Sequence, residues 1–352
     1  MKFTILNQMM RTVNFVPSYI ALHRSGELAR RADALDALLD SCSLCPLLCG
    51  NNRHANDRAR CYTGLLPVVS SYTPHFGEEP GLVGTHGAGN VFFGNCNLRC
   101  VYCQNHQISQ NHRSEQAHEV SIDRLAKIML ELQGRGCHWI GLVSPTHVVP
   151  QIVRALCLAV ERGLHVPLIY NTNGYDSVEV LRLLDGIIDV YLPDLKYAEE
   201  EFGYRYSKVH EYPRHARAGV QEMYRQVGAD LVRDEQGLVR RGLIIRHLVL
   251  PNGLAGSRET LRWIASTLSP QVTLSIMAQY FPAHRASVTP LLDRNVRESE
   301  YNRVLEELDT LGMDRGWVQE FGSAEHYRPA FAQREDPFDN AGERMCTSSE
   351  AQ

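Results

Sequence analysis

The sequence lacks several features that would assign it to common classes of protein. No run of about 18 apolar residues occurs, so no membrane span is expected. Segment 1–15 has no continuous apolar run followed by a small-residue cleavage site, so no secretory signal is expected and the protein is predicted to be cytoplasmic. The formal net charge of -4 argues against nucleic-acid binding by wholesale phosphate neutralisation. There is no internal repeat.

What the sequence does contain is an ordinary globular composition with a local concentration of cysteine. Hydrophobic residues make up 44% and charged residues 22% of 352, which suits a soluble protein with a sizeable core. Seven of the 10 cysteines fall between Cys42 and Cys103. In a reducing compartment such clustering indicates metal rather than disulfides. Cys137 and Cys157 are predicted to be small buried hydrophobic residues, and Cys346 belongs to the tail.

The apolar pattern predicts an α/β fold. From residue 90 onward, short apolar runs alternate with amphipathic helical segments, and the runs lie at 90–94, 139–143, 167–170, 187–192, 243–250, 272–277 and 317–320. Near-continuous apolar runs separated by helices are typical of a parallel sheet covered by helices. No phosphate-binding GxGxxG follows the first run, so we predict a partial (β/α)6-type TIM-like barrel rather than a Rossmann sheet.

Three regions are expected along the chain. Residues 1–89 combine an N-terminal helix with a Cys-rich metal-binding segment, whose order is expected to depend on the metal because it shows little periodicity. Residues 90–325 form the barrel, with 197–241 as an insertion on its rim. Residues 326–352 form a polar tail that is expected to be disordered after about residue 332.

The strongest motif is a cysteine loop directly after the first barrel strand. In NVFFGNCNLRCVYCQNH the strand leads into Cys96-x3-Cys100-x2-Cys103. Loops at the C-terminal ends of barrel strands form the catalytic face. Three thiolates can hold three irons of a [4Fe–4S] cube and leave the fourth iron open, as in a catalytic rather than a structural metal site. A zinc knuckle with His106 as fourth ligand is the structural alternative.

This loop resembles that of the radical S-adenosylmethionine (SAM) superfamily, in the branch related to pyruvate formate-lyase activating enzymes. The resemblance rests on CxxxCxxC with Tyr102 before the last cysteine, and on EEPGLVGTHGAGN before the loop. Further along the chain it rests on GLVSPTHVVPQI, YNTNGY, DVYLPDLKY, IIRHLVLPNG and SIMAQYFPAH. Together these segments extend from about residue 75 to about residue 325.

The resemblance implies an enzyme whose reduced [4Fe–4S] cluster passes one electron to SAM. A 5′-deoxyadenosyl radical then abstracts hydrogen from a substrate, while the protein supplies orientation and excludes water. Activation of a glycyl radical enzyme is one activity that the branch suggests, and the substrate would then be a protein. An electron donor such as flavodoxin or ferredoxin is also implied.

The resemblance further implies residues that contact the cofactor. The superfamily's Gly-Gly-Glu-like segment is replaced by GLVSPTH at 141–147, which has no carboxylate, so Ser144, Thr146 or backbone carbonyls are the candidates for the amino-group contact. Asn171 and Asn173 match a segment that typically hydrogen-bonds the ribose or the methionine part. Tyr102 is a further candidate.

Two cations are candidates for binding the cofactor carboxylate. Lys196 ends the fourth strand and Arg246 lies on the fifth, and the loss of either is expected to weaken cofactor binding. For these residues, as for the polar candidates, the alternative is a side chain that ties loops together at a strand end.

A second cysteine group precedes the barrel. Cys42-x2-Cys45-x3-Cys49-x11-Cys61 supplies four thiolates, which form a closed site for structural Zn²⁺ or for a fully ligated iron–sulfur cluster. Spacing alone does not separate the two metals, and a set of free buried thiols is the third interpretation. A structural role is favoured.

Two other functions fit parts of the sequence. A non-catalytic iron–sulfur electron carrier would explain the cysteines but not a large barrel, and such carriers usually have four cysteines per cluster. A zinc-stabilised nucleic-acid-binding module would be expected to carry a basic helix and positive charge. Binding of SAM separates these functions, because only the radical enzyme needs it.

Overall fold

The computed structural model describes residues 3–5, 11–12, 15–322 and 328–338. Its centre is a series of parallel strands, in which each pairs with the next. They are β4 (Ala88–Phe93), β5 (Ile140–Val143), β6 (Leu168–Thr172), β7 (Val190–Pro193), β9 (Val239–Leu248), β10 (Thr273–Met277) and β11 (Gly316–Gln319). The prediction of an α/β fold with a mostly parallel sheet is confirmed.

Antiparallel strands flank this series at both edges. β3 (Val69–His75) pairs with β4, and β1 (Phe3–Ile5) pairs with β11. In the described chain the order is β1-β11-β10-β9-β7-β6-β5-β4-β3, with β2 (Arg11–Thr12) and β8 (Val232–Arg233) attached beside β9. β3 lies inside the Cys-rich region, where the sequence showed little periodicity.

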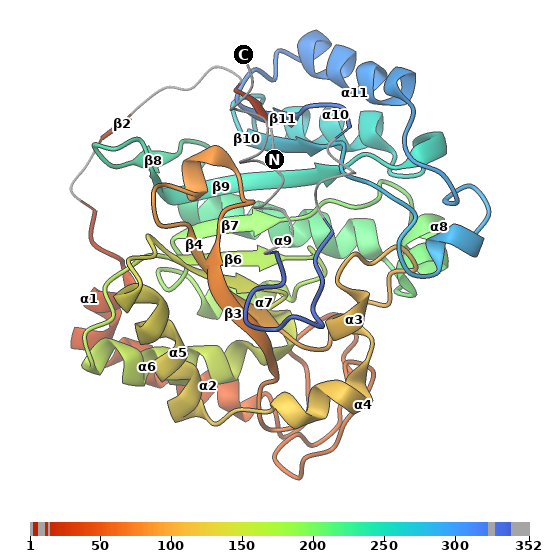
Figure 1. Cartoon of the computed structure of the whole chain (residues 1–352). Helices are drawn as coiled ribbons and strands as arrows, with labels where there is room; N and C mark the ends of the chain where they lie inside the picture. The colour runs from red at the N-terminus through yellow and green to blue at the C-terminus, as the bar shows by residue number, and fades with distance from the viewer. Residues whose placement is uncertain (1–2, 6–10, 13–14, 323–327, 339–352) are drawn as a thin grey trace, which may run out of the picture.

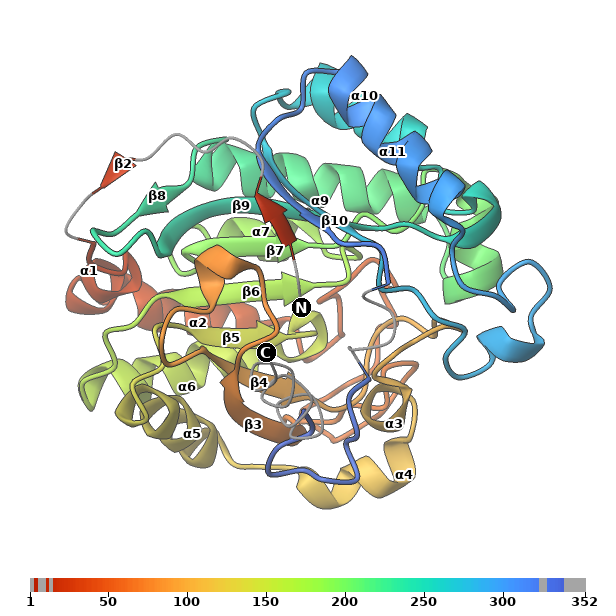
Figure 2. The ribbon, with the colours of Figure 1, turned by 45° about the horizontal axis from the view of Figure 1, so that its top comes forward.

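Every crossover between neighbouring parallel strands contains a helix. These helices are α5 (Ile122–Gly134), α6 (Val149–Glu161), α7 (Val178–Leu183), α9 (Tyr212–Val227), α10 (Ser257–Thr267) and α11 (Glu298–Thr310). α1 (Tyr19–Arg24) and α2 (Glu27–Ala37) pack outside α6. Figures 1 and 2 show α5 and α6 beside one end of the curved sheet and α10 and α11 beside the other. In the described chain no helix has the length and apolar character needed to cross a membrane.

Helix α5 illustrates how the sequence builds these layers. The Ser121 hydroxyl caps the helix by accepting from the backbone N–H of Arg124. The buried side chains recur at three- and four-residue spacing, at Leu125, Ile128, Met129 and Leu132. This stripe packs on a sheet whose strand β5 is buried at every position, as expected for a parallel strand covered on both faces.

The region 197–241 differs from the rim insertion that the sequence suggested. Helix α9 connects β7 to β9, and these strands pair in parallel, so α9 is an ordinary crossover helix of the barrel. The additions are α8 (Glu200–Phe202), the π-helical turn Gly203–Ser207, and a hairpin in which β8 pairs antiparallel with β9. The π-helical turn contacts the cysteine loop.

Part of the expected disordered tail packs on the sheet. The Phe331 and Phe338 rings lie against Phe92 of β4, with centroids 5.5 and 5.6 Å away. Arg334 forms an ion pair of 2.8 Å with the fully buried Glu115 of α4 (His112–Glu115). These contacts order the segment up to residue 338, while Cys346 lies outside the described residues.

The Cys-rich segment is attached to the barrel by a buried arginine. Arg53 is 1% exposed, and its guanidinium donates to the carbonyl of Gly64 (2.8 and 2.7 Å) and to that of His147 (2.6 Å). Cys42 and Leu44 also join the main hydrophobic core. The segment therefore has polar and apolar contacts with the barrel besides any that a metal would add.

Candidate functional site

The cysteine loop follows β4 at the C-terminal edge of the sheet, as the sequence predicted. Because this loop forms neither helix nor strand, its backbone N–H and C=O groups must find hydrogen-bond partners in other parts of the protein. The N–H groups of Arg99 and Val101 donate to the carbonyls of Ser207 (3.1 Å) and Tyr206 (2.8 Å) in the π-helical turn. The Gln110 side chain donates to the carbonyl of Cys100 at 2.8 Å.

The three thiols of the loop line one cavity of about 180 Å³. The described lining contains no further cysteine and no histidine. Cys96 and Cys100 are each 8% exposed, and Cys103 is half-buried. His106 of α3 (His106–Ser109), the proposed zinc ligand, lies outside this lining, and its ring stacks on His284 with centroids 4.8 Å apart.

Each thiol has a polar neighbour. The amide Nδ2 of Asn173 lies 3.4 Å from the Cys96 sulfur, the Ser207 hydroxyl 3.0 Å from the Cys100 sulfur, and the Ser109 hydroxyl 3.2 Å from the Cys103 sulfur. Such groups can donate to thiolate sulfurs. Burial raises the pKa of Cys100 to about 12, so a free thiolate here is disfavoured and a bound cation would stabilise it.

The donor set fits a cluster better than a single ion. Among the described residues, no three His, Cys, Asp or Glu side chains converge closely enough to hold one metal ion. A [4Fe–4S] cube demands less convergence, because each thiolate binds a different iron. The buried thiols, their polar neighbours and the absence of a fourth thiol in the described lining therefore suit a cube with one open iron.

Most predicted cofactor contacts line the same cavity. They are Tyr102, Ser144, Asn171, Asn173, Lys196 and Arg246. Thr146 does not belong to the described lining: it is 1% exposed, and its hydroxyl donates to Asp176 at 2.7 Å. Asp176 also accepts hydrogen bonds from Tyr170 and Thr172 of β6, so Thr146 belongs to a buried hydrogen-bond network at this strand.

Lys196 is a cation of the cavity lining whose charge acts on all three thiols. Its ammonium lies 2.5 Å from a carboxylate oxygen of Asp194. Burial alone would lower the pKa of Lys196, but Asp194 and Cys100 raise it. Its charge in turn lowers the pKa values of all three thiols, against the rise that burial causes. Lys196 therefore remains charged beside the cluster loop.

Arg246 already has two carboxylate partners. Its guanidinium forms two hydrogen bonds of 2.8 Å with Glu79 and a further ion pair with Glu78. Burial would raise the pKa of Glu78, but Arg246, His75 and the hydrogen bond from Asn90 lower it. These glutamates lie 167 and 168 residues from Arg246 in the chain. The segment EEPG contributes to the family resemblance, but nothing in the sequence pairs its glutamates with Arg246. We call this arrangement of Arg246, Glu78 and Glu79 the clamp.

The second cysteine group forms a compact turn. Cys42, Cys45 and Cys61 are buried, and Cys49 is exposed. The backbone N–H of Cys42 donates to the carbonyl of Asn51, and that of Gly50 donates back to Cys42, both at 3.0 Å. Burial raises the pKa of Cys45 to about 12, and the thiols of the other three cysteines add to this rise. The four thiols thus lie within electrostatic reach of one another, although in the described chain they do not converge closely enough to hold one metal ion.

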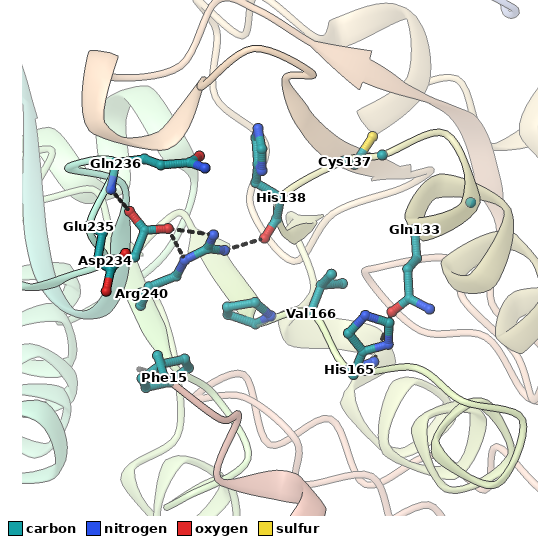
Figure 3. Close-up of a pocket in the computed structure, with 13 residues that line it drawn as sticks. Phe15, Gln133, Cys137, His138, His165, Val166, Asp234, Glu235, Gln236 and Arg240 are labelled. Carbon is teal, nitrogen blue, oxygen red and sulfur yellow. Dashed lines mark hydrogen bonds and ion pairs between the residues drawn. The ribbon is translucent and has the colours of Figure 1, made fainter. Parts of the chain in front are cut away.

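A larger hollow of about 850 Å³ lies elsewhere on the sheet (Figure 3). Cys137 and His138 precede β5 and His165 precedes β6, so this hollow lies at the N-terminal ends of the strands, opposite the cysteine loop. None of the predicted site residues lines it. Its Arg240 is neutralised by Asp234 at 2.6 Å. The larger volume therefore does not identify the functional site. The smaller cavity is the candidate, because the three thiols and the predicted cofactor contacts line it.

Comparison with known proteins agrees with this geometry. Residues 90–229 match the model of the Radical SAM superfamily. The matched region spans the cysteine loop and the next three parallel strands, so this part of the chain is similar to the Radical SAM superfamily. This superfamily typically uses a [4Fe–4S] cluster and SAM. An uncharacterized protein of Methanocaldococcus jannaschii is 28% identical over 288 residues, which cover 79% of this chain and 77% of that protein.

The clamp on Arg246 leads to a stability prediction. Arg246→Ala should lower the free energy of unfolding by about 3–5 kcal/mol, because it leaves two buried carboxylates without their cation. Replacing all three partners, as Glu78→Gln/Glu79→Gln/Arg246→Met, should recover most of that loss. Denaturant unfolding of the apoproteins measures both. Equal stability of Arg246→Ala and the parent protein would exclude the clamp.

Proposed function

We propose that this protein reductively cleaves SAM, with Cys96, Cys100 and Cys103 holding three irons of a [4Fe–4S] cluster. One observation carries the proposal: the three thiols of one loop, two of them buried and one half-buried, line a single cavity whose described lining has no fourth thiol or imidazole. When bound and reduced, the cluster and SAM would supply a 5′-deoxyadenosyl radical for hydrogen abstraction. An electron carrier or a zinc-stabilised binding module would not need a cavity lined by polar side chains beside its cysteines.

The chain's own residues would orient the cofactor. Lys196 is the better candidate to attract the cofactor carboxylate, since it has one carboxylate partner, Asp194, whereas Arg246, the other cation of the described lining, is held by both Glu78 and Glu79. Asn171 and Ser144 offer hydrogen bonds on the neighbouring strand ends. The Ser144 backbone is left-handed at φ 57° and its N–H donates to Asn171 at 2.9 Å, which fixes this corner of the cavity.

Other residues would keep water from a reactive radical. Phe92, Leu98, Val143, Leu248 and Met277 give the cavity an apolar wall. Phe331 and Phe338 of the C-terminal segment cover the Phe92 ring from the other side. A water-excluding wall suits hydrogen abstraction, because it prevents side reactions of the intermediate.

For the substrate, we propose a macromolecular or small molecule that gives up a hydrogen atom, with a glycyl radical enzyme as the leading protein candidate. The support is the resemblance of the cysteine loop and the later segments to pyruvate formate-lyase activating enzymes, which is an argument by analogy. The second cysteine group is proposed as a closed metal site that holds the N-terminal segment against the barrel.

The cysteine triad gives the first test. The anaerobically reconstituted protein should contain a reducible [4Fe–4S] cluster and form 5′-deoxyadenosine from SAM with dithionite. Cys96→Ala/Cys100→Ala/Cys103→Ala should form none, because no thiolates remain on the loop to hold the irons. Chromatographic detection of 5′-deoxyadenosine checks this, with Cys137→Ala as a control that removes a core thiol. Product formation by the triple variant would refute the site.

Lys196 gives a second test. Lys196→Ala should keep its iron content and lose about 2–5 kcal/mol of SAM binding free energy, because a buried carboxylate loses its paired cation. Equilibrium binding of SAM to the reconstituted variant measures this loss. Lys127→Ala, which removes an exposed ion pair on α5, is the matched control. An affinity equal to that of the parent would assign Lys196 to structure alone.

The second cysteine group gives a third test. Cys45→Ser/Cys49→Ser should reduce soluble yield or thermal stability and retain one [4Fe–4S] cluster per chain, because its site has no open coordination position. Metal analysis of the Cys96/Cys100/Cys103 variant identifies the metal: zinc indicates a structural site, and four residual irons indicate a second cluster. If that variant binds neither metal, the closed-site proposal fails.

A further inference from the structure

A hollow of about 560 Å³ behind the cysteine loop is lined by cations without any acidic residue. We call it the basic pocket. Its permanent cations are Arg60, Arg99, Lys208 and Arg285, joined by His112 and His284. This concentration contrasts with the whole chain, whose formal net charge is -4. A local excess of one charge in a protein of the opposite net charge indicates a specific partner rather than general polyanion binding.

The four permanent cations have no carboxylate partner in the described chain, unlike Lys196 and Arg246 of the cofactor cavity. Arg99 donates instead to the carbonyls of Cys96 (2.7 Å) and Leu98 (2.9 Å), and Arg60 donates to that of Lys208. The cations therefore repel one another, and an anionic partner would relieve this repulsion.

The basic pocket and the cofactor cavity lie on opposite sides of one loop. Arg99 belongs to the cysteine loop, yet no residue lines both hollows. Lys208 follows Ser207, whose hydroxyl contacts the Cys100 sulfur, and the N–H of Arg285 donates to the carbonyl of Val101 at 2.9 Å. The cysteine loop thus separates the two hollows: its thiols face the cofactor cavity, and the basic pocket lies on its other side.

We propose that the basic pocket docks an acidic one-electron carrier protein, which reduces the cluster through the loop. The inference rests on the proposed function, in which SAM and substrate fill the cavity side and the electron must enter from another face. In the step, the reduced carrier loses one electron and the oxidised cluster gains it, with no bond made or broken. Charge complementarity identifies the partner as acidic.

A protein suits this surface better than a small anion. The guanidinium groups of Arg60 and Arg99 could each bind a phosphate with two hydrogen bonds. Both instead donate to main-chain carbonyls, which leaves them fewer donors for a small anion. Lys208 and Arg285 are exposed and carry no ion pair within the described chain, which suits steering of a large partner. Tyr62 in the lining and Val288 beyond it are 40% and 81% exposed, so apolar contact area adjoins the charges.

The test uses full-length reconstituted protein and oxidised flavodoxin as the acidic probe. Lys208→Glu/Arg285→Glu should bind flavodoxin about tenfold or more weakly than the parent at low ionic strength, mainly through a slower association rate. Arg24→Glu/Arg303→Glu makes the same change in net charge at exposed arginines of α1 and α11, and should bind like the parent. Interferometry at low and high salt measures both, and the difference should shrink as salt rises.

Activity separates this inference from the proposed function. With dithionite, the parent and both double variants should form 5′-deoxyadenosine equally; with reduced flavodoxin, only Lys208→Glu/Arg285→Glu should be slow. Failure of the parent with dithionite would refute the proposed function. Success with dithionite, combined with equal flavodoxin binding by both double variants, would refute the docking site alone. Binding of a single-stranded RNA probe is measured in the same way. If Lys208→Glu/Arg285→Glu lost RNA binding and still bound flavodoxin like the parent, the basic pocket would be a nucleic-acid site and the docking proposal would be overturned.

Discussion

The cysteine loop has to be held rigidly although it forms neither helix nor strand. Its backbone groups find partners in several places, among them the π-helical turn at Tyr206 and Ser207, the side chain of Gln110, the guanidinium of Arg99 and the N–H of Arg285. Because an unpaired buried backbone group costs about 1–3 kcal/mol, each of these elements is tied to the position of the thiols. The rest of the site, from the cavity wall to the basic pocket, is arranged around this loop.

Charge inside the cavity is organised in pairs. Asp194 accompanies Lys196, and Glu78 and Glu79 accompany Arg246. Of these carboxylates only Asp194 and Glu78 line the cavity, where they balance its two cations. Buried charges are tolerated only when paired, and the pairing also fixes where each side chain points. The cations of the basic pocket, which have no carboxylate partner in the described chain, are kept on the opposite side of the loop.

The features that could be predicted from the sequence are those that short stretches of the chain determine. Continuous apolar runs such as Ile140–Val143 identified the parallel strands, and strand–loop order placed Cys96 at the C-terminal edge of the sheet. The Glu79–Arg246 clamp was not predictable, because its partners are brought together only by the sheet order. Thr146 was assigned to the cofactor from the pattern of its segment, yet its hydroxyl is committed to Asp176, a partner 30 residues away.

The C-terminal segment has a consequence for the order of assembly. The Ser71 hydroxyl donates to the carbonyl of Arg334, a residue 263 positions later in the chain. Contacts of such separation close a very large loop and are favoured only after the intervening barrel has formed. The aromatic cover over Phe92 is therefore expected to be among the last parts of the molecule to fold.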